Sequence, residues 1–292
     1  MRYFFDSICT WSYWRYAVFS TEAVARFFAA VGVMWLFIEL FEFFNIYTKD
    51  KYSVFAFPII MLVAFVYVLA TRRPVSRVRY KIPKRDFSVE VRIGNILDSP
   101  GEVIISTNTT FDTDITNGLI APESLQGQFL LKYFPGNYGD LEKQIEESLN
   151  GEKSRTDNNR KGKNEVYKIG TVARVKAHGK NFYFLAMSEL NEHGTASSTP
   201  RMIDDALEAL WKYMATRGEL GEIAIPVLGT GRGRVSLSRK KIIERIAQSF
   251  ADASTDAVFS NKLSIIVHPG DVPKHKINLF EIRDYLMSSL HI

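Results

Sequence analysis

The sequence predicts an α/β fold, with a largely parallel sheet covered by helices on both faces, preceded by two membrane-spanning helices. From about Phe87 onward, short apolar segments typical of buried strands alternate with amphipathic segments typical of helices. Before Phe87, long apolar stretches with few charges dominate the chain. The 292 residues carry a formal net charge of +5 and one cysteine, Cys9, which excludes an intramolecular disulfide.

Two segments in the N-terminal part are candidate membrane spans. Tyr52 to Ala70 are nineteen residues without a charge, and a helix rising ~1.5 Å per residue crosses a ~30 Å hydrocarbon core over that length. The segment 27–45 is similar but carries Glu39 and Glu42 on one helix face. These carboxylates either reach the interface or line a seam between helices. The residues between the spans, 46–52, are expected to form a tight hairpin.

Basic residues after the second span set the predicted orientation. The segment 71–85 holds seven arginines and lysines and no acid, so the positive-inside rule places it in the cytoplasm, and two spans return the N-terminus to the same side. Much of the positive charge therefore belongs to membrane topology, which favours contacts with anionic lipid over a nucleic-acid partner. The predicted organisation is a cytoplasmic or interfacial segment 1–22, a transmembrane hairpin 23–70, a basic linker 71–86 and a folded domain 87–292.

Strands and helices are expected to alternate along the folded domain. The expected strands are 88–97, 101–108, two within 166–190 around a turn at His178-Gly179, 222–229 and 262–269. The expected helices are 121–134, 138–151, 199–218, 236–253 and 278–290. Ser236 or Ser238 begins the fourth of these helices. The charged segment 151–165 is expected to be a surface loop.

Two loops follow buried strands, at the sheet edge where α/β proteins bind ligands. One loop spans 107–114, and the other begins at Gly229 in the sequence IPVLGTGRGRV. Alternating glycines allow a tight turn with several N–H groups aimed at one point, and the helix near Ser238 adds a partial positive charge. The spacing is neither that of a Walker A loop nor that of a Rossmann fingerprint. The loop fits a diphosphate, although a plain surface turn has the same composition.

Three motifs occur together in the folded domain: GNIL after VEVRI, an Asn-bearing loop after VIIS, and IPVLGTGRG after a strand. This combination resembles the macro domain, a three-layer α/β/α module that binds ADP-ribose. The macro-domain aspartate that meets adenine corresponds to Asn95, whose side-chain carbonyl is also an acceptor. Asn108 matches the last asparagine of the loop that reaches the distal ribose, but the glycines that normally follow it are replaced, which argues against ordinary ADP-ribosyl hydrolysis.

The resemblance and the two loops together give a set of expected ligand-binding residues. They are Asn95, Ile96, Thr107, Asn108, Thr109, Phe111, Asp112, Leu228, Gly229, Thr230, Gly231, Arg232, Gly233 and Arg234. Asp112 is expected to pair with a cationic group at the distal end of the ligand, and Phe111 either stacks on the ligand or fills the core. Arg232 and Arg234 are either partners of the diphosphate or solvated loop residues. The scattered histidines show no metal-ligand spacing, so neither a metal nor a resident cofactor is expected.

The sequences STNTTFDT, SLQGQF and YKIGTVARV follow the two expected membrane spans. With those spans, they resemble more closely the membrane-anchored macro effector of type II Thoeris antiphage systems. This resemblance implies a TIR-domain partner that makes histidine-conjugated ADP-ribose from NAD. It also implies a non-enzymatic effector that oligomerises and disrupts the bacterial inner membrane, killing the infected cell. Two alternatives are a membrane-anchored ADP-ribosyl or O-acetyl-ADP-ribose hydrolase and a passive reader of ADP-ribosylated proteins.

Overall fold

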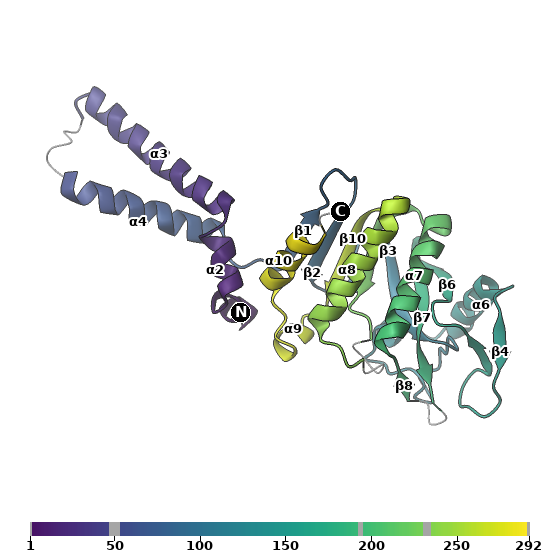
Figure 1. Cartoon of the computed structure of the whole chain (residues 1–292). Helices are drawn as coiled ribbons and strands as arrows, with labels where there is room; N and C mark the ends of the chain where they lie inside the picture. Colours follow the sequence, from purple (N-terminus) through teal and green to yellow (C-terminus); the bar gives the residue numbers. More distant parts are fainter. Residues whose placement is uncertain (1, 47–52, 192–194, 230–234, 291–292) are drawn as a thin grey trace. The chain divides into compact units, whose positions relative to one another are not determined.

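The computed structural model describes residues 2–46, 53–191, 195–229 and 235–290 (Figure 1). The chain divides into two compact units, Met1–Val75 and Ser76–Ile292. Most of the hairpin expected at 46–52 lies outside the described residues.

The first unit is helical. Its helices are α1 (Arg2–Ile8), α2 (Trp11–Ala17), α3 (Thr21–Phe43) and α4 (Ser53–Thr71). The helix α3 begins where the Ser20 hydroxyl accepts a hydrogen bond from the backbone N–H of Ala23. Both α3 and α4 are long and apolar enough to cross a membrane, and large apolar side chains are exposed along them. The prediction of two helices capable of spanning a membrane is therefore confirmed.

A buried arginine joins the end of α4 to the start of α3. Arg72 is only 2% exposed. Its Nε donates to the Tyr16 carbonyl at 2.9 Å, and its Nη2 donates to Ser20 Oγ at 3.0 Å. Its Nη1 lies 3.0 Å from a carboxylate oxygen of Glu22, and the guanidinium stacks 4.1 Å from the centre of the Tyr16 ring. One side chain thus fixes the base of the helical hairpin.

The second unit is built on a mixed, mainly parallel sheet, as predicted. The strand order is β1-β2-β10-β9-β3-β7-β6, in which the five central strands are parallel and the two edge strands are antiparallel to their neighbours. The strands are β1 (Arg77–Lys81), β2 (Ser88–Ile93), β3 (Glu102–Asn108), β6 (Val172–Ala177), β7 (Lys180–Leu190), β9 (Leu220–Pro226) and β10 (Ser260–Val267). The short β8 (Ala196–Ser197) pairs with β7, and β4 (Ser154–Thr156) pairs with β5 (Glu165–Tyr167).

Helices cover both faces of this sheet, which gives the expected three layers. On one face lie α5 (Leu125–Tyr133) and α6 (Tyr138–Leu149), where Phe129 packs 4.7 Å from Phe182 of β7. Figure 1 shows α7, α8 and α10 on the other face, and Phe250 of α8 packs 5.7 Å from Phe87 there. These helices, with the short α9, span Pro200–Arg217 (α7), Arg239–Asp256 (α8), Asp271–Lys274 (α9) and Leu279–Ser289 (α10).

Helix starts agree with the capping residues in the sequence. Ser238, one of the two candidates, accepts from the N–H of Lys241 and begins α8. Ser124 does the same for α5, and Thr199 for α7. The expected turn between β6 and β7 is also present. His178 and Gly179 both have positive φ, as a two-residue hairpin requires.

The segment 71–86 is not a simple linker, because it contains β1. Val78 and Tyr80 point to the face of the sheet that α10 covers. The arginines and the lysine that alternate with them along β1 are exposed. This period-two alternation is a strand signal, which the density of positive charge obscures. Likewise the segment 151–165, expected to be a loop, contains β4 and the start of β5.

The contacts of Arg72 predict a specific stability effect. Arg72→Gln removes the guanidinium and is expected to destabilise the helical unit by about 2 kcal/mol, because hydrogen bonds to Tyr16 and Ser20 are lost in a buried setting. Thermal unfolding of the full chain in detergent measures the effect. Arg73→Gln, at the exposed neighbouring position, is the matched control. Equal unfolding temperatures for the two variants would contradict the assigned role of Arg72.

Candidate ligand-binding site

A cavity of about 350 Å³ lies at the carboxyl ends of the parallel strands. Five central strands contribute to it, through Asn95 after β2, Asn108 of β3, Ser188 of β7, Gly229 after β9 and His268 after β10. The cavity also takes in the start of α5, at Ser124 to Gln126. Its size and its mixed polar and apolar walls suit a nucleotide-sized ligand.

The structure brings some of the expected ligand-binding residues together and leaves others apart. Those that line the cavity are Asn95, Ile96, Thr107, Asn108 and Gly229. Four more are buried and do not line it, namely Thr109, Phe111, Asp112 and Leu228. The remaining five lie outside the described residues, namely Thr230, Gly231, Arg232, Gly233 and Arg234.

The loop after β3 is held by a buried carboxylate. Asp112 is 1% exposed and accepts hydrogen bonds from the Asn108 side-chain amide at 3.1 Å, from the Thr110 hydroxyl, and from the Lys163 backbone N–H at 2.8 Å. Asn108 Oδ1 in turn accepts from the backbone N–H groups of Thr110 and Asp112, at 3.1 and 3.3 Å. Asp112 therefore binds its own chain, and through it fixes the orientation of the cavity-lining Asn108.

Gln126 connects the same loop to the start of α5. Its side-chain oxygen accepts from the Thr107 hydroxyl at 3.0 Å, and its side-chain nitrogen donates to the Asp112 carbonyl at 2.6 Å. Ser124 caps α5 by accepting from the Gly127 N–H at 3.0 Å. The positive end of the α5 dipole thus lines the cavity, an arrangement that favours an anionic group of a ligand.

Phe111 fills the core. Its backbone has a positive φ of 49°, its side chain is 1% exposed, and its ring meets that of Tyr167 edge to face at 5.6 Å. Of the two alternatives for this residue, the structure shows the core position. Burial, followed by the hydrogen bond to Glu165, raises the pKa of Tyr167 to about 12, so this partner ring stays neutral at physiological pH.

Gly229 begins the glycine-rich turn in a conformation that requires glycine. Its φ is +66°, and a Cβ there would lie 2.4 Å from Cγ2 of Val235. The Val235 N–H donates to the Gly229 carbonyl at 3.3 Å, so these two residues lie close together.

Several cavity residues were not expected from the sequence. Ser188 lines the cavity because it pairs with Asn108 where β7 and β3 end side by side, and Met187 and Leu190 of the same strand also line it. His268 follows β10, where its Nδ1 accepts from the Gly270 N–H at 3.2 Å. The position of His268 just beyond a predicted buried strand was the signal that could have identified it. Among the described residues, no group of His, Cys, Asp and Glu side chains is arranged to hold a metal ion.

Comparison with known proteins identifies the class of protein to which this fold belongs. The macrodomain of Oceanobacillus iheyensis, solved with ADP, superposes with a TM-score of 0.50 at 12% identity, over 74% of this chain and 98% of that one. The second unit therefore has the macro-domain fold, and macro domains bind ADP-ribose-type ligands. The model of the family "Thoeris protein ThsA, Macro domain" matches residues 89–268, and the chain belongs to this family. The Thoeris protein ThsA of Bacillus amyloliquefaciens (strain Y2) is 22% identical over 210 residues, 69% of each chain.

The packing around Asp112 predicts unequal effects of two glycine substitutions. Gly151 and Gly162 share a φ of +88°, so alanine strains the backbone equally at both. At Gly162 the added Cβ would also lie 2.4 Å from Asp112 Oδ1, whereas at Gly151 nothing lies within 4 Å. Gly162→Ala should therefore cost about 1–2 kcal/mol more than Gly151→Ala. Denaturant unfolding of both variants tests this, and equal losses would show that the contact between Gly162 and Asp112 does not constrain the loop.

Proposed function

We propose that the cavity binds an ADP-ribose-type signal and that the chain is the membrane effector of an antiphage system. The observation that carries this proposal is a preformed cavity at the carboxyl ends of a macro-domain sheet, within a chain that also has two helices able to span a membrane. The proposed location is the bacterial inner membrane, with both termini in the cytoplasm. The proposed source of the signal is a TIR-domain enzyme that converts NAD to a histidine-conjugated ADP-ribose.

The walls of the cavity support a particular orientation of the ligand. Asn95 offers an acceptor at one end, where the resemblance to macro domains puts adenine. The turn at Gly229 and the positive end of α5 suit the diphosphate. Asn108 lies toward the distal ribose in this arrangement. A group conjugated to that ribose would then extend beyond Asn108.

The loop after β3 supports sensing over hydrolysis. Asn108 accepts from the backbone N–H groups of Thr110 and Asp112 with its side-chain oxygen and donates one of its two amide hydrogens to Asp112, so most of its hydrogen-bonding capacity is used within its own loop. Asp112, the carboxylate bonded to Asn108, is buried and accepts from the Lys163 backbone, so it is not exposed to the cavity. The other candidate bases in the cavity wall, Glu123, Asp271 and His268, lie on other segments. General-base catalysis needs a basic group within reach of the attacking water. We propose on this basis that the ligand is bound without being consumed and that no cofactor participates.

Binding changes the membrane part only if the ligand favours one conformation of the chain over another. We propose that the ligand-bound form self-associates and that the helical unit then disrupts the membrane. The short connection between the two units supports such coupling. Val75 accepts from the Tyr3 hydroxyl at 3.1 Å within the first unit, and the next residue, Ser76, accepts from the Ile93 N–H at 2.9 Å within the second.

The full chain in lipid vesicles tests the proposed function. Calorimetry against ADP-ribose, histidine-conjugated ADP-ribose and adenosine ranks the ligands, and release of a trapped dye reports membrane disruption. We expect the conjugate to bind most tightly and to cause dye release. Absence of dye release at saturating conjugate rules out the effector function. Conversion of the conjugate to free ADP-ribose at catalytic rates identifies the hydrolase instead.

Asn95 provides a local test of ligand orientation. Asn95→Ala removes the acceptor expected to meet adenine and should weaken ADP-ribose binding about tenfold, equivalent to ~1.4 kcal/mol. Asn95 also caps a short 3-10 helix through the Leu97 N–H at 3.1 Å. Asn95→Asp keeps both the cap and the acceptor, and it should preserve or raise the affinity measured by calorimetry. Unchanged binding by Asn95→Ala would show that adenine lies elsewhere.

A further inference from the structure

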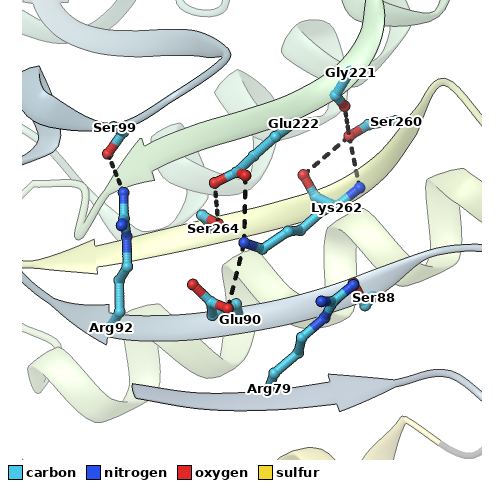
Figure 2. Close-up of polar contacts among 10 residues, drawn as sticks. All are labelled: Arg79, Ser88, Glu90, Arg92, Ser99, Gly221, Glu222, Ser260, Lys262 and Ser264. Carbon is cyan, nitrogen blue, oxygen red and sulfur yellow. Dashed lines mark hydrogen bonds and ion pairs between the residues drawn. The ribbon is translucent and has the colours of Figure 1, made fainter. Parts of the chain in front are cut away.

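One face of the sheet carries charged side chains where strands β1, β2, β10 and β9 lie together. Figure 2 shows Arg79, Glu90, Arg92, Glu222 and Lys262 on these strands, with hydrogen bonds and ion pairs linking several of them to one another and to nearby serines. The strand register places these side chains in rows across the sheet. In one row Arg79 lies opposite Glu90, and in the next Ser88 lies between Lys81 and Lys262. We define the charged face as Arg77, Arg79, Lys81, Glu90, Arg92, Glu222 and Lys262.

The opposite side of these strands is apolar and packs under helices. Val89, Val91 and Leu263 alternate with the charged positions and are fully buried. The helices α8 and α10, which contact β10 and β1, lie on that apolar side, as the contact between Phe87 and Phe250 of α8 shows. The helices α5 and α6 pack on the same side as the charged face, but mainly over β3 and β6. The three cations of the edge strand, Arg77, Arg79 and Lys81, remain exposed.

Both acids of the charged face form an ion pair with the same lysine, Lys262. Lys262 Nζ lies 3.3 Å from a carboxylate oxygen of Glu90 and 3.3 Å from one of Glu222. Ser264 donates to Glu222 at 2.7 Å. Within the described ranges, Arg77 and Lys81 have no ion-pair partner, and the Arg79 Nε donates to Ser88 Oγ at 3.1 Å. The surface therefore presents cations at its edge, with its carboxylates already paired beneath them.

Chain connectivity limits how far these cations can lie from a membrane. Arg77 is six positions after Thr71, the last residue of α4, and six extended residues span at most ~20 Å. An anionic leaflet attracts each nearby lysine or arginine enough to raise binding about fivefold, and the attraction decays over a Debye length of ~8 Å. The like charges on β1 also oppose pairing of this edge strand with the same strand of another copy.

We propose that the charged face binds the phosphate headgroups of anionic lipids in the membrane that α3 and α4 span. This inference rests on the proposed membrane location. It goes beyond the proposed function because it assigns a lipid-binding surface to the ligand-binding unit itself. Arg77, Arg79 and Lys81 contact the headgroups, and the ion pairs of Lys262 keep Glu90 and Glu222 from repelling them.

The test uses the full chain, one copy per nanodisc. The bilayer is phosphatidylcholine alone or an equimolar mixture with phosphatidylglycerol. A Cys9→Ser, Asp86→Cys background places a donor dye in the turn that follows β1, and energy transfer to a headgroup-labelled acceptor lipid reports proximity. Arg77→Gln/Arg79→Gln/Lys81→Gln removes the cations. Lys153→Gln/Arg155→Gln/Lys161→Gln is the matched control, because it removes the same charge from exposed positions on and beside β4.

We expect transfer to rise in anionic discs for the background and the control, to fall at high salt, and to stay at its neutral-disc value in the β1 variant. Unchanged unfolding temperature and ADP-ribose affinity of the β1 variant exclude misfolding. Equal energy transfer in neutral and anionic discs for the background protein overturns the proposal. It is also overturned if the control variant loses the rise in energy transfer as fully as the β1 variant does. If the rise in energy transfer occurs only with several copies per disc, the charged face binds another copy of the chain and the proposal is overturned. If a duplex oligonucleotide binds the charged face more strongly than anionic lipid does, the proposal is likewise overturned. Failure of the chain to insert into discs overturns the membrane location instead, so the two failures are distinguishable.

Discussion

Parallel pairing of the five central strands is the constraint on which the rest of this unit depends. Parallel strands end at one edge, so residues as distant in sequence as Gly94 and His268 line the same cavity. Each connection between parallel strands must pass over a face of the sheet; these connections supply α5, α6, α7 and α8, whereas α10 follows the last strand, β10. The antiparallel edge strands β1 and β6 close the sheet without adding to the cavity. The cavity is therefore a consequence of topology, and only its lining is specific to this sequence.

One carboxylate, that of Asp112, fixes the orientation of the cavity-lining Asn108. A charged group as buried as Asp112 is tolerated only when donors surround it, and here they come from Asn108, Thr110 and the backbone of Lys163. The donors belong to two segments about fifty residues apart, so folding of the loop after β3 is tied to that of the segment before β5. Asn108 is consequently held in one orientation before any ligand arrives, which lowers the ordering cost of binding.

Sequence patterns predicted the local features and missed those that depend on distant contacts. Alternation and capping residues such as Ser238 predicted most strands and helices. Strand-end reasoning predicted that Asn108 and Gly229 meet at one edge of the sheet, and the resemblance to macro domains added Asn95, which lines the same cavity. The structural role of Asp112 could not be predicted, because its partner Lys163 lies in a segment that has no local signal for this contact. The strand β1 was missed for a different reason, since its arginines and lysine are equally typical of a membrane flank and of an exposed strand face.

The cations of β1 fit both interpretations for a physical reason, because this segment is at once the flank of an apolar helix and the edge strand of the sheet. Val78 is buried and Tyr80 partly buried on the face that α10 covers, while the cations of β1 follow closely after α4, a helix capable of spanning a membrane, as the positive-inside rule expects of a cytoplasmic flank. The charged face also reaches the ligand cavity along one strand. Arg92 donates to Ser99 Oγ at 2.7 Å, in the crossover that carries the cavity residue Asn95. A ligand that orders this crossover therefore acts on a segment already bonded to the charged face. The cations proposed to contact lipid lie on β1, which pairs with β2, and Asn95 of the proposed ligand site follows β2, so β2 would connect the two proposed binding events.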